Sequence, residues 1–99
     1  MERQEGIAMT KRVQARVSGR VQGVGFRFYA AHVAGELGIV GTVRNCEDGG
    51  VEAVAEAEEA SLHEFLRALR HGPHAAEVTE VATAWDEPTG EFTGFAAVS

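Results

Sequence analysis

Cysteine and long apolar runs are both scarce in this 99-residue sequence. Its single cysteine, Cys46, rules out a disulfide within the chain and is typical of a protein from a reducing compartment. No stretch approaches the roughly 20 apolar residues of a membrane span, and the first residues lack the apolar core of a secretory signal. We therefore expect a cytoplasmic protein that does not bind membranes.

Positive charge is also in short supply. Nine Lys and Arg stand against fifteen Asp and Glu, which gives a formal net charge of -6. Because this charge repels phosphate backbones, it disfavours a nucleic-acid partner. An apolar fraction of 44% in 99 residues suits one globular domain with one core. We expect a monomeric domain over residues 11–99, after a loose extension over residues 1–10.

The spacing of apolar residues predicts the strands and helices. Alternation of apolar and polar residues indicates strands at 12–18, 39–46, 51–57, 78–85 and 92–98. Asp48-Gly49 between the second and third of these predicts an antiparallel hairpin. Apolar residues three and four apart predict a helix that starts at Phe26 and stops at Gly38.

A second helix is expected before Gly72-Pro73. Its apolar face carries leucines and a phenylalanine, and Ser61 and Glu64 have the spacing of a capping box at its start. The order is then strand, helix, strand, strand, helix, strand and a terminal strand. This order predicts an α+β fold, the ferredoxin-like βαββαβ sandwich, with two helices on one face of a mainly antiparallel sheet and a short extra C-terminal strand.

One glycine-rich segment stands out between the first strand and the first helix. Residues 19–27 read GRVQGVGFR. Glycines let backbone amides approach an anion, a helix start adds unpaired N–H groups, and Arg27 adds a guanidinium suited to phosphate oxygens. Taken alone, the three glycines fit a tight turn that binds nothing equally well. No P-loop lysine and no complete dinucleotide fingerprint is present.

Two stretches of the sequence resemble the signatures of a known family. Residues 19–27 closely resemble one signature of the acylphosphatase family, and residues 41–51, GTVRNCEDGGV, resemble its other signature. The similarity continues over about residues 11–98. It implies hydrolysis of small-molecule acyl phosphates to a carboxylate and phosphate, without a metal or other cofactor.

The resemblance also implies which residues carry the chemistry. The phosphoryl group would be held by Arg27 and by a loop whose members are Arg20, Val21, Gln22, Gly23, Val24 and Gly25. Asn45 would position the attacking water. An acyl phosphate releases a carboxylate that needs little protonation, so positioning and charge neutralisation suffice, and a phosphate oxygen can take the proton of the water.

Two alternatives belong to other functional classes. A non-catalytic module that binds phosphate or an acyl phosphate would keep the same pocket, as in acylphosphatase-like domains of larger carbamoyl-transfer enzymes. A ferredoxin-like RNA binder is a distant third, because the aromatic residues at 26, 28 and 29 begin a helix and the net charge is negative.

The remaining polar clusters have simpler interpretations. Cys46 is interpreted as a strand residue packed as a small hydrophobe, because a Cys-x5-Arg phosphatase needs an arginine where Glu52 stands. His71 and His74 lack further ligands for a metal. His32 and His63 are expected to face solvent. The acidic residues Glu52, Glu56, Glu58 and Glu59 are expected to form a solvated surface. Phe26 and Tyr29 are expected in the core, with Phe28 more exposed.

Overall fold

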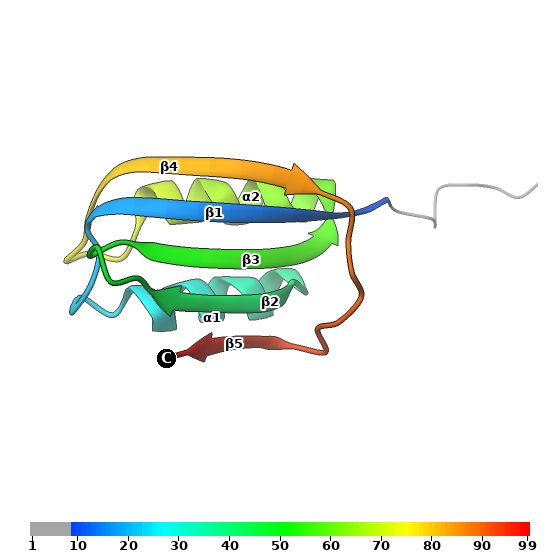
Figure 1. The fold of residues 1–99 in the computed structure, drawn as a ribbon, viewed down its shortest axis with the longest axis horizontal. Helices are drawn as coiled ribbons and strands as arrows, with labels where there is room; N and C mark the ends of the chain where they lie inside the picture. The colour runs from blue at the N-terminus through cyan, green and yellow to red at the C-terminus, as the bar shows by residue number, and fades with distance from the viewer. Residues whose placement is uncertain (1–8) are drawn as a thin grey trace, which may run out of the picture.

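The computed structural model describes residues 9–99, which form a five-stranded sheet covered on one face by two helices (Figure 1). The elements in chain order are β1 (Thr10–Arg20), α1 (Phe26–Leu37), β2 (Val40–Asn45), β3 (Val51–Glu58), α2 (Glu59–His71), β4 (Glu77–Asp86) and β5 (Phe95–Val98). The strand order is β4-β1-β3-β2-β5, with β5 parallel to β2 and the other neighbours antiparallel. The predicted ferredoxin-like sandwich with an added strand is confirmed. Neither described helix has the length and apolar character needed to cross a membrane.

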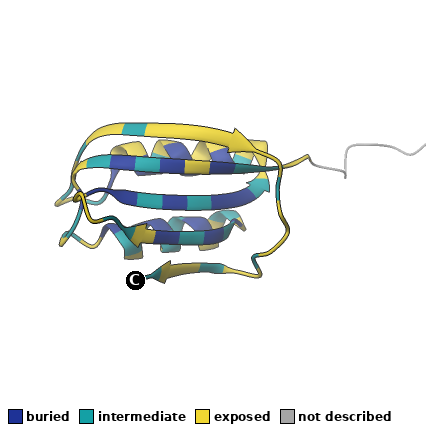
Figure 2. Ribbon diagram, viewed as in Figure 1, coloured by how far each residue is buried: buried dark blue, intermediate teal, exposed yellow. Residues whose placement is uncertain are grey.

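The core lies between the sheet and the two helices (Figure 2). Val13, Ala15 and Val17 of β1 are fully buried, as their alternation predicts. On α2 the buried side chains are Leu62, Phe65, Leu66 and Leu69. Each large side chain that is fully removed from water stabilises the fold by roughly 1.5–3 kcal/mol before entropy is counted. The same packing fixes where β1 ends and α1 begins, and therefore fixes the loop between them.

Glycines end both helices where the sequence predicts. Gly38 is left-handed (φ 71°), and the next residue, Ile39, donates its N–H to Ala34 at 2.9 Å. Gly72 donates to the carbonyl of Ala68 at 2.9 Å and closes α2. The predicted start of α2 is wrong, however. The helix follows β3 directly at Glu59 and no side chain caps it, so Ser61 lies inside the helix rather than at a capping box.

Several strand boundaries differ from the predicted ones, and three of these differences bear on the predictions above. Thr10, assigned to the extension, already pairs within β1, while residues 1–8 of that extension lie outside the described residues. Cys46 follows β2 and is partly exposed in the turn, so its interpretation as a packed strand residue is wrong. The last strand starts at Phe95 rather than at Phe92.

The segment that leads into β5 is attached to the sheet by Glu56. Glu56 on β3 accepts hydrogen bonds from the backbone N–H groups of Thr89 (2.8 Å) and Gly90 (3.1 Å), from the Thr89 hydroxyl (3.1 Å) and from Arg12 Nη1 (2.8 Å). These contacts hold residues 89–90 over Glu56, which is only 3% exposed. The prediction of a solvated carboxylate is therefore wrong at Glu56.

The charge of Glu56 is stabilised by the same contacts. Burial by itself raises the pKa of this carboxyl, but the hydrogen bonds from Thr89, Arg12 and Gly90 outweigh burial and lower the pKa to about 2. Glu56 is thus an ionised side chain that ties the segment between β4 and β5 to the sheet.

Candidate active site

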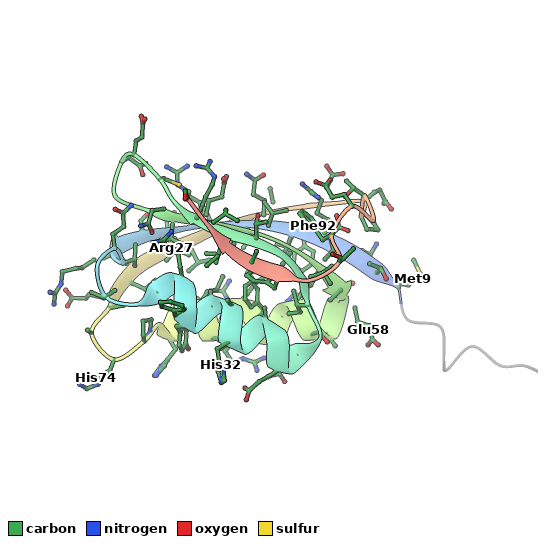
Figure 3. All side chains as sticks on the ribbon, turned by 90° about the horizontal axis from the view of Figure 1, so that it is seen from below. Met9, Arg27, His32, Glu58, His74 and Phe92 are labelled. Atoms are coloured by element: carbon green, nitrogen blue, oxygen red, sulfur yellow. The ribbon has the colours of Figure 1, made fainter. Side chains whose placement is uncertain are left out.

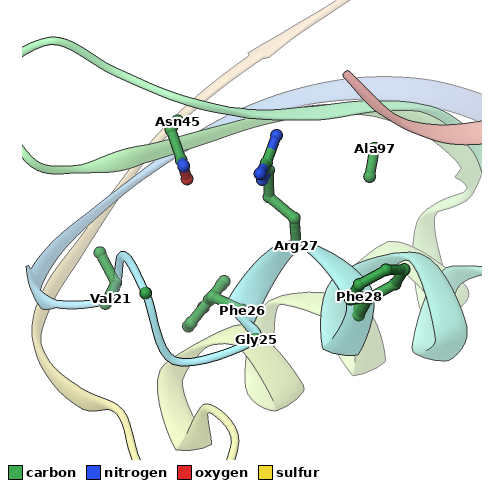
Figure 4. Close-up of a pocket in the computed structure, with 8 residues that line it drawn as sticks. Val21, Gly25, Phe26, Arg27, Phe28, Asn45 and Ala97 are labelled. Atoms are coloured by element: carbon green, nitrogen blue, oxygen red, sulfur yellow. The ribbon is translucent and has the colours of Figure 1, made fainter. Parts of the chain in front are cut away.

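A cavity of about 400 Å³ opens where the loop after β1, the start of α1, the end of β2 and β5 meet (Figure 4). The residues that line it are Val21, Gly23, Gly25, Phe26, Arg27, Phe28, Asn45 and Ala97. The structure therefore brings the two predicted catalytic residues, Arg27 and Asn45, to one pocket. Half of the predicted loop residues line it as well.

The loop reaches the pocket because two glycines take left-handed backbone conformations. Gly23 has φ 74° and Gly25 has φ 79°, and a Cβ at either position would meet open space, so the dihedral angle rather than crowding demands glycine. Gly25 is also the N-cap of α1. Within residues 9–99 no side chain caps this helix, and no acidic residue lies in its first turn. The described part of the chain thus places no side-chain acceptor on the first N–H groups of α1, at the positive end of its dipole.

Arg27 stands in the first turn of α1 and points across the pocket toward the sheet (Figure 4). Its Nη1 donates to the carbonyl oxygen of Val98 on β5 at 2.8 Å. Among residues 9–99 no carboxylate forms an ion pair with it. A neutral carbonyl orients the guanidinium without cancelling its charge, which leaves that charge available to an anion.

Asn45 is the last residue of β2 and faces the same cavity (Figure 4). Its Cα partner on β3 is Val51, and the turn between them is closed by a bond from the Cys46 N–H to the Gly50 carbonyl at 2.8 Å. The tight hairpin therefore sets the position of Asn45 relative to the loop.

Gln22 connects the loop to that hairpin. Its Nε2 donates to the carbonyls of Cys46 and Gly50, both at 2.8 Å. Three residues of the predicted phosphate-binding set do not line the pocket: Arg20, Gln22 and Val24. The Gln22 side chain is occupied by the turn, and Val24 packs against the core.

Asp48 organises the far side of the same turn. It accepts a hydrogen bond from the Gly50 N–H at 3.0 Å and pairs with Arg16 of β1. The bond from Gly50 is the main cause that lowers the pKa of this carboxyl, and the charge of Arg16 adds to it. The turn that carries Asn45 is thus held from both sides.

The histidines lie away from this cavity. His32 and His63 are exposed on the helices, as expected, and each is within 3.4 Å of a glutamate four residues away. Figure 3 shows His32 pointing away from the sheet and His74 in the turn after α2. None of them lines the cavity.

Three lining residues, Phe26, Phe28 and Ala97, had not been assigned to the site from the sequence. Phe28, expected to be more exposed than its neighbours, is 82% exposed and lines the pocket together with Ala97 of β5. Phe26 is buried and Phe28 is exposed, as predicted, but Tyr29 is only half-buried and does not belong to the core; its hydroxyl donates to the Ala68 carbonyl at 2.9 Å. The position of Phe28 directly after Arg27 was the one available signal.

Comparison with known proteins identifies the family. The family model for acylphosphatase matches residues 13–97. The chain belongs to the acylphosphatase family. An acylphosphatase of Methylococcus capsulatus is 49% identical over 88 residues, which are 89% of this chain and 96% of the relative. The resemblance seen in the sequence is thereby confirmed.

Solved structures agree with this acylphosphatase assignment. The crystal structure of acylphosphatase from Bacillus subtilis superposes with a TM-score of 0.87 at 32% identity, covering 90% of this chain and 99% of that one. Full-length HypF, in its phosphate- and nucleotide-bound form, contains a similar region, with a TM-score of 0.83 and 25% identity, which spans 94% of this chain but 12% of HypF. The acylphosphatase fold thus also occurs inside a much larger protein.

Proposed function

We propose that this acylphosphatase-family enzyme hydrolyses acyl phosphates by gripping the phosphoryl group between Arg27 and the amides of the glycine loop, while Asn45 orients the attacking water. The observation that carries the proposal is the meeting of Arg27, Asn45 and the left-handed glycines in one cavity. Membership of the family supports the activity, and the geometry supports the roles of the residues.

The loop and Arg27 suit a phosphoryl group with two negative charges. Unpaired N–H groups at the start of α1 and a guanidinium without a carboxylate partner in residues 9–99 both favour an anion. Phosphoryl transfer passes through a loose transition state with charge on the equatorial oxygens, so fixed donors around it lower the barrier. No covalent intermediate is required.

Asn45 suits the role of holding a neutral nucleophile. A side-chain amide both donates and accepts hydrogen bonds, so it can orient water without repelling the phosphate. Of the eight residues that line the cavity, Arg27 alone has a titratable side chain. We therefore infer that an oxygen of the substrate takes the proton of the water as the P–O bond to the carboxylate breaks.

The direct test is release of inorganic phosphate from acetyl phosphate by the purified protein in the presence of a chelator. We expect Arg27→Ala and Asn45→Ala each to lower kcat/KM by about 10² or more, the loss usual for a transition-state donor. Both should retain the far-ultraviolet circular dichroism and the melting temperature of the parent protein. Arg67→Ala, which removes an exposed arginine of α2, is the matched control and should leave the rate unchanged.

Two results would contradict the proposal. The first is absence of turnover at micromolar enzyme together with tight binding of inorganic phosphate, which would favour the non-catalytic module. The likeness to a part of HypF keeps that alternative relevant. The second is a rate near that of the parent protein in either pocket variant, which would remove the role assigned to that residue.

A further inference from the structure

The two ends of the cavity differ in the side chains they carry. Asn45 lies with Val21 on one side of Arg27, and the side chains of Phe28 and Ala97 lie on the other side, so the side-chain amide is present at one end only (Figure 4). The sheet register also separates Ala97 from Asn45, because Ala97 on β5 pairs with Val43, which lies two residues before Asn45 on β2. The two ends therefore differ in both chemistry and position.

In-line phosphoryl transfer would use the two ends of the cavity for different parts of the reaction. In phosphoryl transfer the attacking and leaving oxygens lie roughly in line on opposite sides of phosphorus. If Asn45 holds the water at one end of the cavity, the leaving carboxylate and its acyl group point to the other end. That end is where Phe28 and Ala97 line the wall.

From this arrangement we infer that Phe28 and Ala97 form a subsite for the acyl group, which selects acyl phosphates with an apolar, preferably aromatic, acyl part. The inference rests on the proposed function and adds the substrate class. The Phe28 ring offers a flat face for stacking, and the small Ala97 side chain leaves room beside it.

The exposure of Phe28 supports a binding role. At 82% exposure it is the most exposed of the large hydrophobic residues that the structure describes, and it contributes little to the core. A single exposed aromatic residue is ordinary on a protein surface. This one, however, borders the same cavity as Arg27, which has no carboxylate partner in residues 9–99, so a ligand whose phosphoryl group is held by Arg27 can also contact the Phe28 ring.

The first experiment compares hydrolysis of benzoyl phosphate and acetyl phosphate. We expect Phe28→Ala to lower kcat/KM for benzoyl phosphate by about 3- to 10-fold, mainly through KM, because stacking on one aromatic ring is lost. The value for acetyl phosphate should change by less than about 2-fold, and inhibition by inorganic phosphate should not change, since neither carries a large acyl group. Phe28→Tyr should keep the preference.

Trp85→Ala is the matched control. Trp85 is exposed at the end of β4, packs against the His63 ring at 5.1 Å between centroids, and does not line this cavity. Its loss should leave the ratio of the two substrates unchanged. The inference is overturned if Phe28→Ala lowers kcat/KM equally for both substrates. It is also overturned if Trp85→Ala changes the ratio of the two kcat/KM values as much as Phe28→Ala does.

A second measurement separates the subsite from catalysis. Phenacylphosphonate and acetonylphosphonate replace the bridging oxygen of the two substrates by a methylene group, so they bind without turnover. Calorimetry should show that the parent protein binds phenacylphosphonate about 3- to 10-fold more tightly, and that Phe28→Ala removes this difference. A preference in binding without hydrolysis of either substrate would support the subsite and refute the catalytic proposal. Equal binding by the parent protein would refute the subsite even if both substrates were hydrolysed.

Discussion

The two polar side chains of the site are held in place by different kinds of contact. Asn45 sits on a hairpin that is fastened to the loop by the neutral amide of Gln22. Arg27 donates to β5, and β5 follows a segment fastened to the sheet by the ionised and buried Glu56. The Gln22 contact is neutral and adjacent to the cavity. The Glu56 contact is charged and lies along the segment that leads to β5.

The Gln22 contact and the Glu56 contact therefore differ in how they depend on pH. The amide of Gln22 does not titrate, so its contact with the turn that carries Asn45 is independent of pH. The Glu56 carboxylate works only while it is ionised, so the placement of β5, and with it the acceptor for Arg27, depends on pH and on the fold as a whole. Four changes test this difference between the two contacts.

Replacing Glu56 should have the largest effect. Glu56→Gln puts an amide N–H₂ group where donors from Thr89, Gly90 and Arg12 converge, so we expect a loss of about 2 to 4 kcal/mol in the free energy of unfolding. A shift of β5 should also lower kcat, on the order of 10-fold, because Arg27 loses its fixed acceptor. Urea unfolding and acetyl phosphate hydrolysis measure the two effects. Glu58→Gln, at the exposed end of the same strand, should cost far less. Equal losses in the two variants would refute the role of Glu56.

The same carboxylate predicts a dependence of stability on acid. Its pKa is lowered from 4.5 to about 2 in the folded protein, so its contribution is complete above about pH 4.5 and is lost as the pH falls toward about 2. At 1.36 kcal/mol per unit, the loss amounts to at most about 3 kcal/mol. Urea unfolding at a series of pH values should show this decline in the parent protein and a shallower one in Glu56→Gln. Parallel curves would show that another group is responsible.

Removing the Gln22 amide should have a smaller effect on stability and a selective effect on rate. Gln22→Ala removes two hydrogen bonds to carbonyls, which together contribute about 1 to 3 kcal/mol. We expect kcat to fall on the order of 10-fold as Asn45 loses its fixed position, while inhibition by inorganic phosphate stays the same. Gln14→Ala, which removes the exposed amide that contacts Glu52, is the control. If phosphate inhibition weakens in step with kcat, Gln22 binds the phosphoryl group directly, as the sequence had suggested.

The exposed side of the turn should matter least. Asp48→Asn keeps an oxygen that can accept from the Gly50 N–H but removes the charge that pairs with Arg16. Because both side chains are exposed, we expect only a slight decrease in melting temperature, and one that disappears at high salt. Differential scanning calorimetry at low and high salt measures this. A decrease as large as that of Gln22→Ala would mean that the ion pair, rather than the amide, holds the turn.

Much of the fold follows from local patterns in the sequence. The alternation in β1 and the glycines at 38 and 72 specify a buried face and two helix ends through local physics. The start of α2 was missed because β3 passes into the helix without a turn, so the Ser61 spacing suggested a cap where none exists. A helix boundary can be predicted from the local sequence only where a turn or a cap marks it, and no such signal stands between β3 and α2.

The candidate site likewise has features that the local sequence predicts and features that depend on distant segments. Arg27, Asn45 and the glycines could be assigned to one candidate site because their motifs are contiguous in the sequence. The burial of Glu56 was missed because a segment more than 30 residues away covers it, and one carboxylate in an acidic run looks like the next. The direction of the Gln22 side chain depends in the same way on the hairpin opposite. The Phe28–Ala97 wall forms only when β5 pairs beside β2. Contacts of this kind depend on tertiary structure.

The bond between Arg27 and Val98 joins positions that are 71 residues apart. Bringing such distant segments together costs chain entropy, so we expect the site to be complete only once α1 and β5 are both in place. Catalytic activity is therefore a stricter gauge of complete folding than helix content is. During refolding, recovery of turnover should follow the return of the circular dichroism signal.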